Sequence, residues 1–210
     1  MATRIIMQVP VQKWSSSSFE LDYVGVKAPQ FSFTRLQGAD PTLGVEMAST
    51  GEVACLGEDF DEAFLKSLIS VGYHLPFKSV LLSTGPIASK AELLEGVRIL
   101  HQKKIKLYAT GGTASFLKIH QIPVEPVRWP LDKESPTAVD LIKERKIDLV
   151  INIPKSYQRE ELTNGYLIRR AAVDYNVMLI TNRQMAMRFI EALAKGAQDK
   201  LLVHSWQEYS

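Results

Sequence analysis

The sequence has little cysteine, no long apolar run and no block of charge of one sign. Cys55 is the single cysteine of the 210 residues, so the chain can form no internal disulfide and no thiolate metal cluster, which agrees with a reducing compartment. No apolar run reaches the ~18 residues of a membrane span, and the opening MATRIIMQVP lacks the apolar block of a signal peptide. These absences predict a cytoplasmic protein that does not bind a membrane.

Charged residues are frequent but balanced. The chain has 25 lysines and arginines against 23 aspartates and glutamates, a formal net charge of +2, and they are spread along the sequence. No polybasic tail therefore indicates nucleic acid, and an acidic ligand would need a local group of basic residues. With 46% apolar residues, the chain suffices for one sizeable core or for a domain with an appended piece.

From Lys78 onward, short β-type runs alternate with helical patterns. The runs are SVLLS (79–83), IKLYAT (105–110), IDLVINI (147–153) and VMLIT (177–181). This alternation predicts an α/β fold with a parallel sheet. Strands this apolar need helices on both faces of the sheet.

Cap chemistry predicts where the helices between these strands begin and end. Ser-Lys-Ala-Glu at 89–92 is a capping-box pattern, which places Lys90 at the first helical position. The Ser-Pro pair at 135–136 indicates a second helix start. A final helix is predicted to follow the Thr-Asn pair at 181–182 and to stop at Gly196.

Residues 1–77 lack this alternation and are rich in turn signals. The stretch DEAFLKSLISVG predicts one helix, and the serine run at 15–18 predicts a loop. Any strands here are expected to be antiparallel or mixed. The segment is too short and irregular for a complete catalytic domain.

The stretch KLYATGGTASFL (106–117) predicts an anion-binding turn. A strand that ends in Thr-Gly-Gly-Thr and passes into a helix brings backbone N–H groups and two hydroxyls to the carboxyl edge of the sheet, where such folds bind ligands. The glycines allow close backbone approach, and the helix N-terminus supplies partial positive charge. The alternative is a purely structural turn, since neither a Walker lysine nor a G-x-G-x-x-G pattern follows.

Three further polar residues are expected at the same edge. Lys90 follows the strand at 79–83, while Asn152 and Lys155 end or follow the strand at 147–153. Two lysines, two threonines and an amide together suit a phosphate group. The alternative is that both lysines are solvated surface residues. Trp129, in VEPVRWP, either stacks on a ligand base or anchors its loop by packing.

These stretches, in this order, resemble the large subunit of carbamoyl-phosphate synthase. VLLSTG, LYATGGTASFL, VEPVRWP, IDLVINIP, GYLIRRAAVDYNV and LITN resemble its methylglyoxal-synthase-like domain, and VKAPQFSFTRLQGADPTLGVEMASTGEVACLG resembles the stretch before that domain. The resemblance implies an α+β remnant of the carbamate-phosphorylating ATP-grasp domain at residues 1–77. It implies an allosteric domain at 78–210, with a doubly wound, mainly parallel five-stranded sheet.

The resemblance also implies a regulatory region without catalytic or metal-binding residues of its own. The parent enzyme is a glutamine-hydrolysing ligase that uses ATP and Mg²⁺, and its residues for both would lie upstream of this chain. The expected partners are the remainder of the large subunit, the glutaminase small subunit and a phosphorylated effector. A homo-oligomer is also possible, in an enzyme that serves pyrimidine and arginine biosynthesis.

The effector is expected to be a pyrimidine nucleotide such as UMP. The predicted effector-binding residues are Lys90, Thr110, Gly111, Gly112, Thr113, Trp129, Asn152 and Lys155. Trp129 departs from the lysine of some nucleotide-regulated relatives and matches synthases regulated by N-acetylglutamate. Lys155 and Gly165, however, replace asparagines of those relatives, and Ala28 and Leu179 replace polar residues that bind ornithine in some bacterial enzymes. The identity of the effector therefore stays open.

A stand-alone phosphate-elimination enzyme similar to methylglyoxal synthase is the alternative function. Such chemistry needs a carboxylate placed to remove a proton. The loop LDKESP offers Asp132 and Glu134 but lacks the Gly-Gly-Asp arrangement of those enzymes. Asp174 is expected to pair with Arg169 or Arg170 rather than to act as a base.

Overall fold

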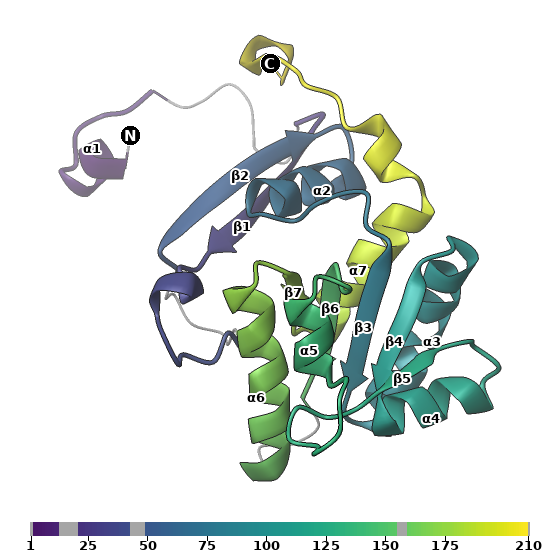
Figure 1. The fold of residues 1–210 in the computed structure, drawn as a ribbon. Helices are drawn as coiled ribbons and strands as arrows, with labels where there is room; N and C mark the ends of the chain where they lie inside the picture. The colour runs from purple at the N-terminus through teal and green to yellow at the C-terminus, as the bar shows by residue number, and fades with distance from the viewer. Residues whose placement is uncertain (1, 13–20, 43–48, 155–158, 210) are drawn as a thin grey trace.

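The computed structural model describes residues 2–12, 21–42, 49–154 and 159–209, which form two sheets of unequal size with their helices (Figure 1). The strands are β1 (Val24–Gln30), β2 (Gly51–Gly57), β3 (Ser79–Thr84), β4 (Lys106–Thr110), β5 (Glu125–Val127), β6 (Leu149–Ile153) and β7 (Met178–Ile180). The α-helices are α1 (Ala2–Ile6), α2 (Phe60–Ser70), α3 (Ile87–Gln102), α4 (Gly111–Ile119), α5 (Ala138–Lys143), α6 (Arg159–Asp174) and α7 (Arg183–Ala194). The 3₁₀ helices are η1 (Phe33–Arg35), η2 (Ala197–Lys200) and η3 (Trp206–Tyr209).

The larger sheet has the order β5-β4-β3-β6-β7, and all its pairings are parallel. The chain runs outward from β3 through β4 to β5 and then crosses to the other side of β3 for β6 and β7. This reversal confirms the predicted doubly wound α/β fold, and the carboxyl ends of β3 and β6 open at its switch point. The fifth strand, β5, was not among the four apolar runs because it contains Pro126 and is largely exposed.

Alternate residues of the central strand enter two separate cores. Val80 and Leu82 pack with α3, α4 and α7 on one face, whereas Leu81 packs with α5 and α6 on the other. All six residues of β3 are buried. The expectation that helices cover both faces is therefore confirmed.

Two predicted helix starts are wrong, that of α3 by three residues and that of α5 by two. α3 begins at Ile87, and the Lys90 N–H already donates to the Pro86 carbonyl at 3.0 Å, so Ser89 lies inside the helix and Lys90 is its fourth residue. α5 is capped by Thr137 rather than at the Ser-Pro pair, because Thr137 forms the capping box with Asp140. In both cases the sequence offered a cap pattern near the one that the fold uses.

The predicted ends of the last helix are confirmed. The Asn182 side chain caps α7 by accepting the Met185 N–H at 2.9 Å. Gly196 follows the helix with φ = 70°, a left-handed conformation that glycine adopts without strain.

The smaller sheet joins β1 and β2 in the expected antiparallel pairing. α2, the predicted helix, packs against both strands and begins at the Asp59 cap. The serine run at 15–18 lies outside the described residues. Assignment of residues 1–77 to an ATP-grasp domain stays a prediction.

Candidate functional site

A row of buried polar side chains crosses three adjacent strands at the carboxyl edge of the larger sheet. The Thr110 hydroxyl of β4 donates to the Ser83 hydroxyl of β3 at 3.1 Å, and Ser83 is the register partner of Asn152 on β6. All three are buried, although they end strands that are otherwise apolar. Ser83 was missed by the sequence reasoning, and its position at the end of an apolar strand was the available signal.

Thr113 ties the first turn of α4 to the end of β3. Its hydroxyl accepts the Thr84 N–H and donates to the Thr84 carbonyl, both at 3.0 Å. The hydroxyl is thus engaged within the framework. Because a hydroxyl proton rotates about its C–O bond, Thr113 can redirect it to a ligand while still accepting from Thr84.

Lys90 and Trp129 both reach the start of α4. The Lys90 ammonium donates to the Gly85 carbonyl at 3.0 Å, and a Cβ added to Gly112 would lie 3.6 Å from Lys90 Nζ. A Cβ added to Gly111 would lie 3.5 Å from Trp129 Nε1. The two glycines therefore leave room beside an ammonium and an indole N–H, at a helix end whose first N–H groups have no partner within the helix.

The structure brings the predicted residues to one edge of the sheet in two groups. Lys90, Gly112 and Thr113 lie with α3 and α4, whereas Thr110 and Asn152 lie with Ser83 on the strand ends. Trp129 and Gly111 adjoin each other between these elements. Lys155 lies outside the described residues, so its predicted place stays a prediction.

Arg169 of α6 adds a buried cation to this edge. Its Nη1 donates to Asn152 Oδ1 at 2.8 Å, and its side chain is 1% exposed. Its other nitrogens bind the carboxylate of Asp40. Burial by itself would raise the pKa of Asp40, but hydrogen bonds from Arg169 and Thr42, with the guanidinium charge, hold that pKa below its usual value.

The sequence reasoning expected Asp174 to pair with one of two arginines, and the structure selects Arg170. The Asp174 carboxylate accepts from Arg170 at 2.9 and 2.5 Å. The sequence analysis named no other partner for Arg169. No short motif marks Arg169, because its partner Asp40 lies 129 positions away in the sequence.

The carboxylates of the loop after Trp129 are engaged in contacts of their own. Asp132 accepts the Trp129 N–H at 2.8 Å, and Glu134 forms an ion pair with Arg128 at 2.5 Å. These contacts fit structural roles in the loop rather than proton abstraction. Across the described ranges, no group of three histidine, cysteine or acidic residues is placed to hold a metal ion.

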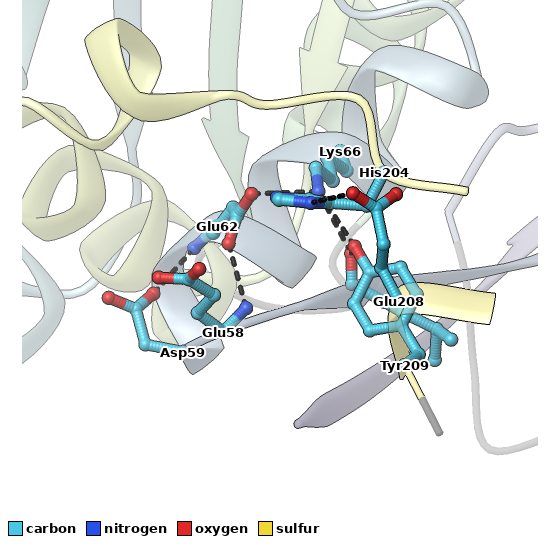
Figure 2. Close-up of polar contacts among 8 residues, drawn as sticks. Glu58, Asp59, Glu62, Lys66, His204, Glu208 and Tyr209 are labelled. Carbon is cyan, nitrogen blue, oxygen red and sulfur yellow. Dashed lines mark hydrogen bonds and ion pairs between the residues drawn. The ribbon is translucent and has the colours of Figure 1, made fainter. Parts of the chain in front are cut away.

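A second polar cluster lies far from this edge and fastens the C-terminal segment to α2 (Figure 2). Lys66 contacts Glu62 at 2.7 Å, the Leu56 carbonyl at 3.1 Å and the Tyr209 hydroxyl at 3.4 Å. Burial would lower the pKa of Lys66, but its bonds to Glu62 and Tyr209 raise it overall. A cavity of about 410 Å³ adjoins the cluster, and Cys55 lies in its wall. With three acceptors around its ammonium, Lys66 has a structural role, which is to hold the C-terminal segment against α2.

A family model and several known proteins match this chain. Residues 92–181 match the family described as MGS-like domain, a match that begins just after Lys90. A solved methylglyoxal synthase from Elizabethkingia anophelis is 20% identical, with a TM-score of 0.38 over 54% of this chain and 76% of that chain. In the described part of the chain, no helix combines the length and apolar character of a membrane span.

Curated relatives match almost the whole chain. The multifunctional protein ura1 of Schizosaccharomyces pombe is 41% identical over 99% of this chain, and the multifunctional protein pyr-3 of Neurospora crassa is 46% identical over 93%. The mitochondrial carbamoyl-phosphate synthase (ammonia) of Rattus norvegicus is 40% identical over 90%. The chain spans only 10%, 11% and 13% of these relatives. Residues 92–181 thus match the MGS-like domain family, within a chain that is similar over at least nine tenths of its length to a segment of carbamoyl-phosphate synthase and multifunctional proteins.

Proposed function

We propose that this chain is the regulatory C-terminal region of a carbamoyl-phosphate synthase large subunit. Residues 1–77 would carry the end of the carbamate-phosphorylating ATP-grasp domain, and 78–210 the allosteric domain. The effector is a phosphorylated metabolite, with a pyrimidine nucleotide such as UMP as the first candidate. Binding of this effector controls carbamoyl phosphate formation for pyrimidine and arginine biosynthesis. The protein partners of the chain are the remainder of the large subunit and the glutaminase subunit.

The observation that carries this proposal is the position of Lys90 at the start of α4. Its ammonium adjoins Gly112, where helix N–H groups and partial positive charge gather at the edge of a doubly wound sheet. A phosphate there would receive a charge-assisted hydrogen bond from Lys90 and neutral ones from α4. One contact of Lys90 is a neutral carbonyl, that of Gly85 at 3.0 Å, and an ammonium binds an anion more strongly than a neutral carbonyl.

The remaining predicted residues suit the rest of a nucleotide. The Trp129 indole beside Gly111 offers an aromatic face and an N–H donor. Arg169 donates to the side-chain carbonyl oxygen of Asn152, so the amide nitrogen of Asn152 faces away from that guanidinium. Thr110 and Thr113 contribute hydroxyls that now bond to neighbouring strands.

Removal of the Lys90 ammonium tests the proposal. One hydrogen bond to a charged group contributes about 1.5–3 kcal/mol, so Lys90→Ala should weaken UMP binding roughly ten- to a hundredfold in a calorimetric titration. Lys103→Ala is the matched control, since this lysine is exposed at the opposite end of α3. Equal affinities of wild type and Lys90→Ala would remove Lys90 from the site. If no phosphorylated metabolite binds, the Thr-Gly-Gly-Thr turn has only a structural role.

The alternative activity is tested by incubating the protein with dihydroxyacetone phosphate. We expect no methylglyoxal, because Asp132 and Glu134 are engaged within their loop. Methylglyoxal formation that is lost in Asp132→Asn or Glu134→Gln would establish the phosphate-elimination enzyme instead.

A further inference from the structure

Residues 33–42, here called the docked segment, run beside α6 (Figure 1). Three side chains on one face of that helix hold the segment there. Tyr166, Arg169 and Arg170 have the i, i+3, i+4 spacing that places side chains together. The Tyr166 hydroxyl donates to the Gly38 carbonyl at 3.0 Å. The Arg170 guanidinium donates to three further backbone carbonyls, those of Leu36 at 3.0 Å, Ala39 at 3.2 Å and Phe33 at 3.0 Å.

Arg169 joins the docked segment to the strand edge. Its Nε and Nη2 bind the two carboxylate oxygens of Asp40 at 2.7 and 2.5 Å, while Nη1 binds Asn152 Oδ1 at 2.8 Å. A Cβ added to Gly165 would lie 3.0 Å from this Nη1. A side chain at this position would crowd the guanidinium, and glycine leaves room for it. One buried cation thus contacts a carboxylate outside the site and an amide within it.

We propose that Asp40 and an anion bound at the strand edge compete for the single positive charge of Arg169, so that the bound anion loosens the docked segment. This inference rests on the proposed function, because it needs an anion beside Asn152. Asp40 is 37% exposed, so it can exchange the guanidinium for water, whereas Arg169, at 1% exposure, cannot. The lowered pKa of Asp40 keeps its carboxylate charged at neutral pH.

The expected sign of the coupling follows from charge. Two anions on opposite sides of one guanidinium repel each other through a partly buried region, where charges interact more strongly than they do in water. Each therefore weakens the binding of the other by the same factor. The effector would in this way change the contact between residues 33–42 and α6 without touching Asp40.

Neutralising Asp40 tests the competition. Asp40→Asn keeps the shape and one acceptor for Arg169 but removes the charge, so inorganic phosphate and UMP should each bind about three- to tenfold tighter in calorimetric titrations. Asp174→Asn is the matched control, because it removes the same charge from Arg170, which does not contact Asn152. Unchanged or weaker binding in Asp40→Asn, or equal tightening in both variants, would overturn the inference.

Hydrogen exchange of the wild-type chain gives an independent measurement. The amides of Leu36 and Ala39 bond within the docked segment at 3.1 and 3.2 Å, and they should exchange several-fold faster when phosphate is bound. Exchange that stays unchanged or slows at saturating phosphate would contradict the loosening.

The two probes separate this inference from the proposed function. If UMP fails to bind while phosphate binds more tightly to Asp40→Asn, the competition stands and UMP is rejected as effector. If UMP binds equally to wild type and Asp40→Asn, the effector site stands and the competition is rejected. Failure of both probes to bind rejects both.

Discussion

The two sheets differ in how they are stabilised. Strand β3 of the larger sheet is buried along its whole length between two cores, whereas β1 and β2 are mostly half-buried or exposed and have a helix, α2, on one side. The smaller unit is joined to the larger one by apolar packing, since Leu65 and Leu68 of α2 lie in the same core as β3, and by polar contacts. Asp61 of α2 pairs with Lys195 at 2.5 Å and Arg188 at 3.4 Å, and the Tyr73 hydroxyl donates to the Leu179 carbonyl at 2.6 Å.

This contrast shows that β3 is held by burial on both faces, whereas β1 and β2 depend on α2, which is anchored in the core, and on specific contacts. Two-stranded sheets are marginal in water by themselves. The described contacts of residues 33–42 and of α2 therefore decide where the smaller unit lies.

Truncating one apolar side chain in each sheet should lower the free energy of unfolding by different amounts. Leu82→Ala removes a side chain that is 1% exposed in the central strand, and should lower the free energy of unfolding by about 2–5 kcal/mol. Val26→Ala in half-buried β1 should lower it by less than about 1 kcal/mol. Urea denaturation of both variants measures the difference. Equal losses would show that the smaller sheet contributes to the main core as fully as β3 does.

Removing one hydroxyl tests a contact between the units. Burial raises the pKa of Tyr73, so its hydroxyl stays protonated and donates to Leu179. Tyr73→Phe keeps the ring against Phe189 and loses that bond, which should cost about 1 kcal/mol in urea denaturation. Tyr23→Phe is the control, since Tyr23 lies at the far end of β1 against Tyr209. A loss in Tyr73→Phe no larger than in the control would show that the ring alone makes the contact.

Acid should weaken the polar contacts before it unfolds the larger sheet. The pKa values of Asp40 and Glu62 are both below their usual values, because bonds from Arg169 and from Lys66 outweigh burial, which alone would raise them. A lowered folded-state pKa adds stability above the unfolded value near pH 4, and that stability is lost as the pH falls through the folded value. Hydrogen exchange between pH 5 and 3 should therefore show a small, early loss of protection in residues 33–42. Loss of protection in β3 at the same pH would contradict this order.

The sequence by itself determined the fold class, most of the strands, the Thr-Gly-Gly-Thr turn and the resemblance to the synthase. These follow from local patterns, because apolar runs, glycine and cap residues act over a few positions. The expected capping box at 89–92 was wrong because α3 starts at Ile87, after the cap residue Pro86, only two residues beyond the end of β3. Where two neighbouring sequence patterns could each start a helix, only the packing of the folded chain decides which one does.

Only the tertiary structure decided which polar residues meet. Ser83 joins Thr110 and Asn152 through strand register, and Arg169 reaches Asp40 across 129 positions of sequence. No local pattern encodes such pairs, because they depend on the order of strands in the sheet and on the placement of α6. The sequence predicted that the Thr-Gly-Gly-Thr turn would lie at a strand edge. The fold decided that a buried arginine would connect that edge to the rest of the chain, since a buried charge requires partners that only the folded chain supplies.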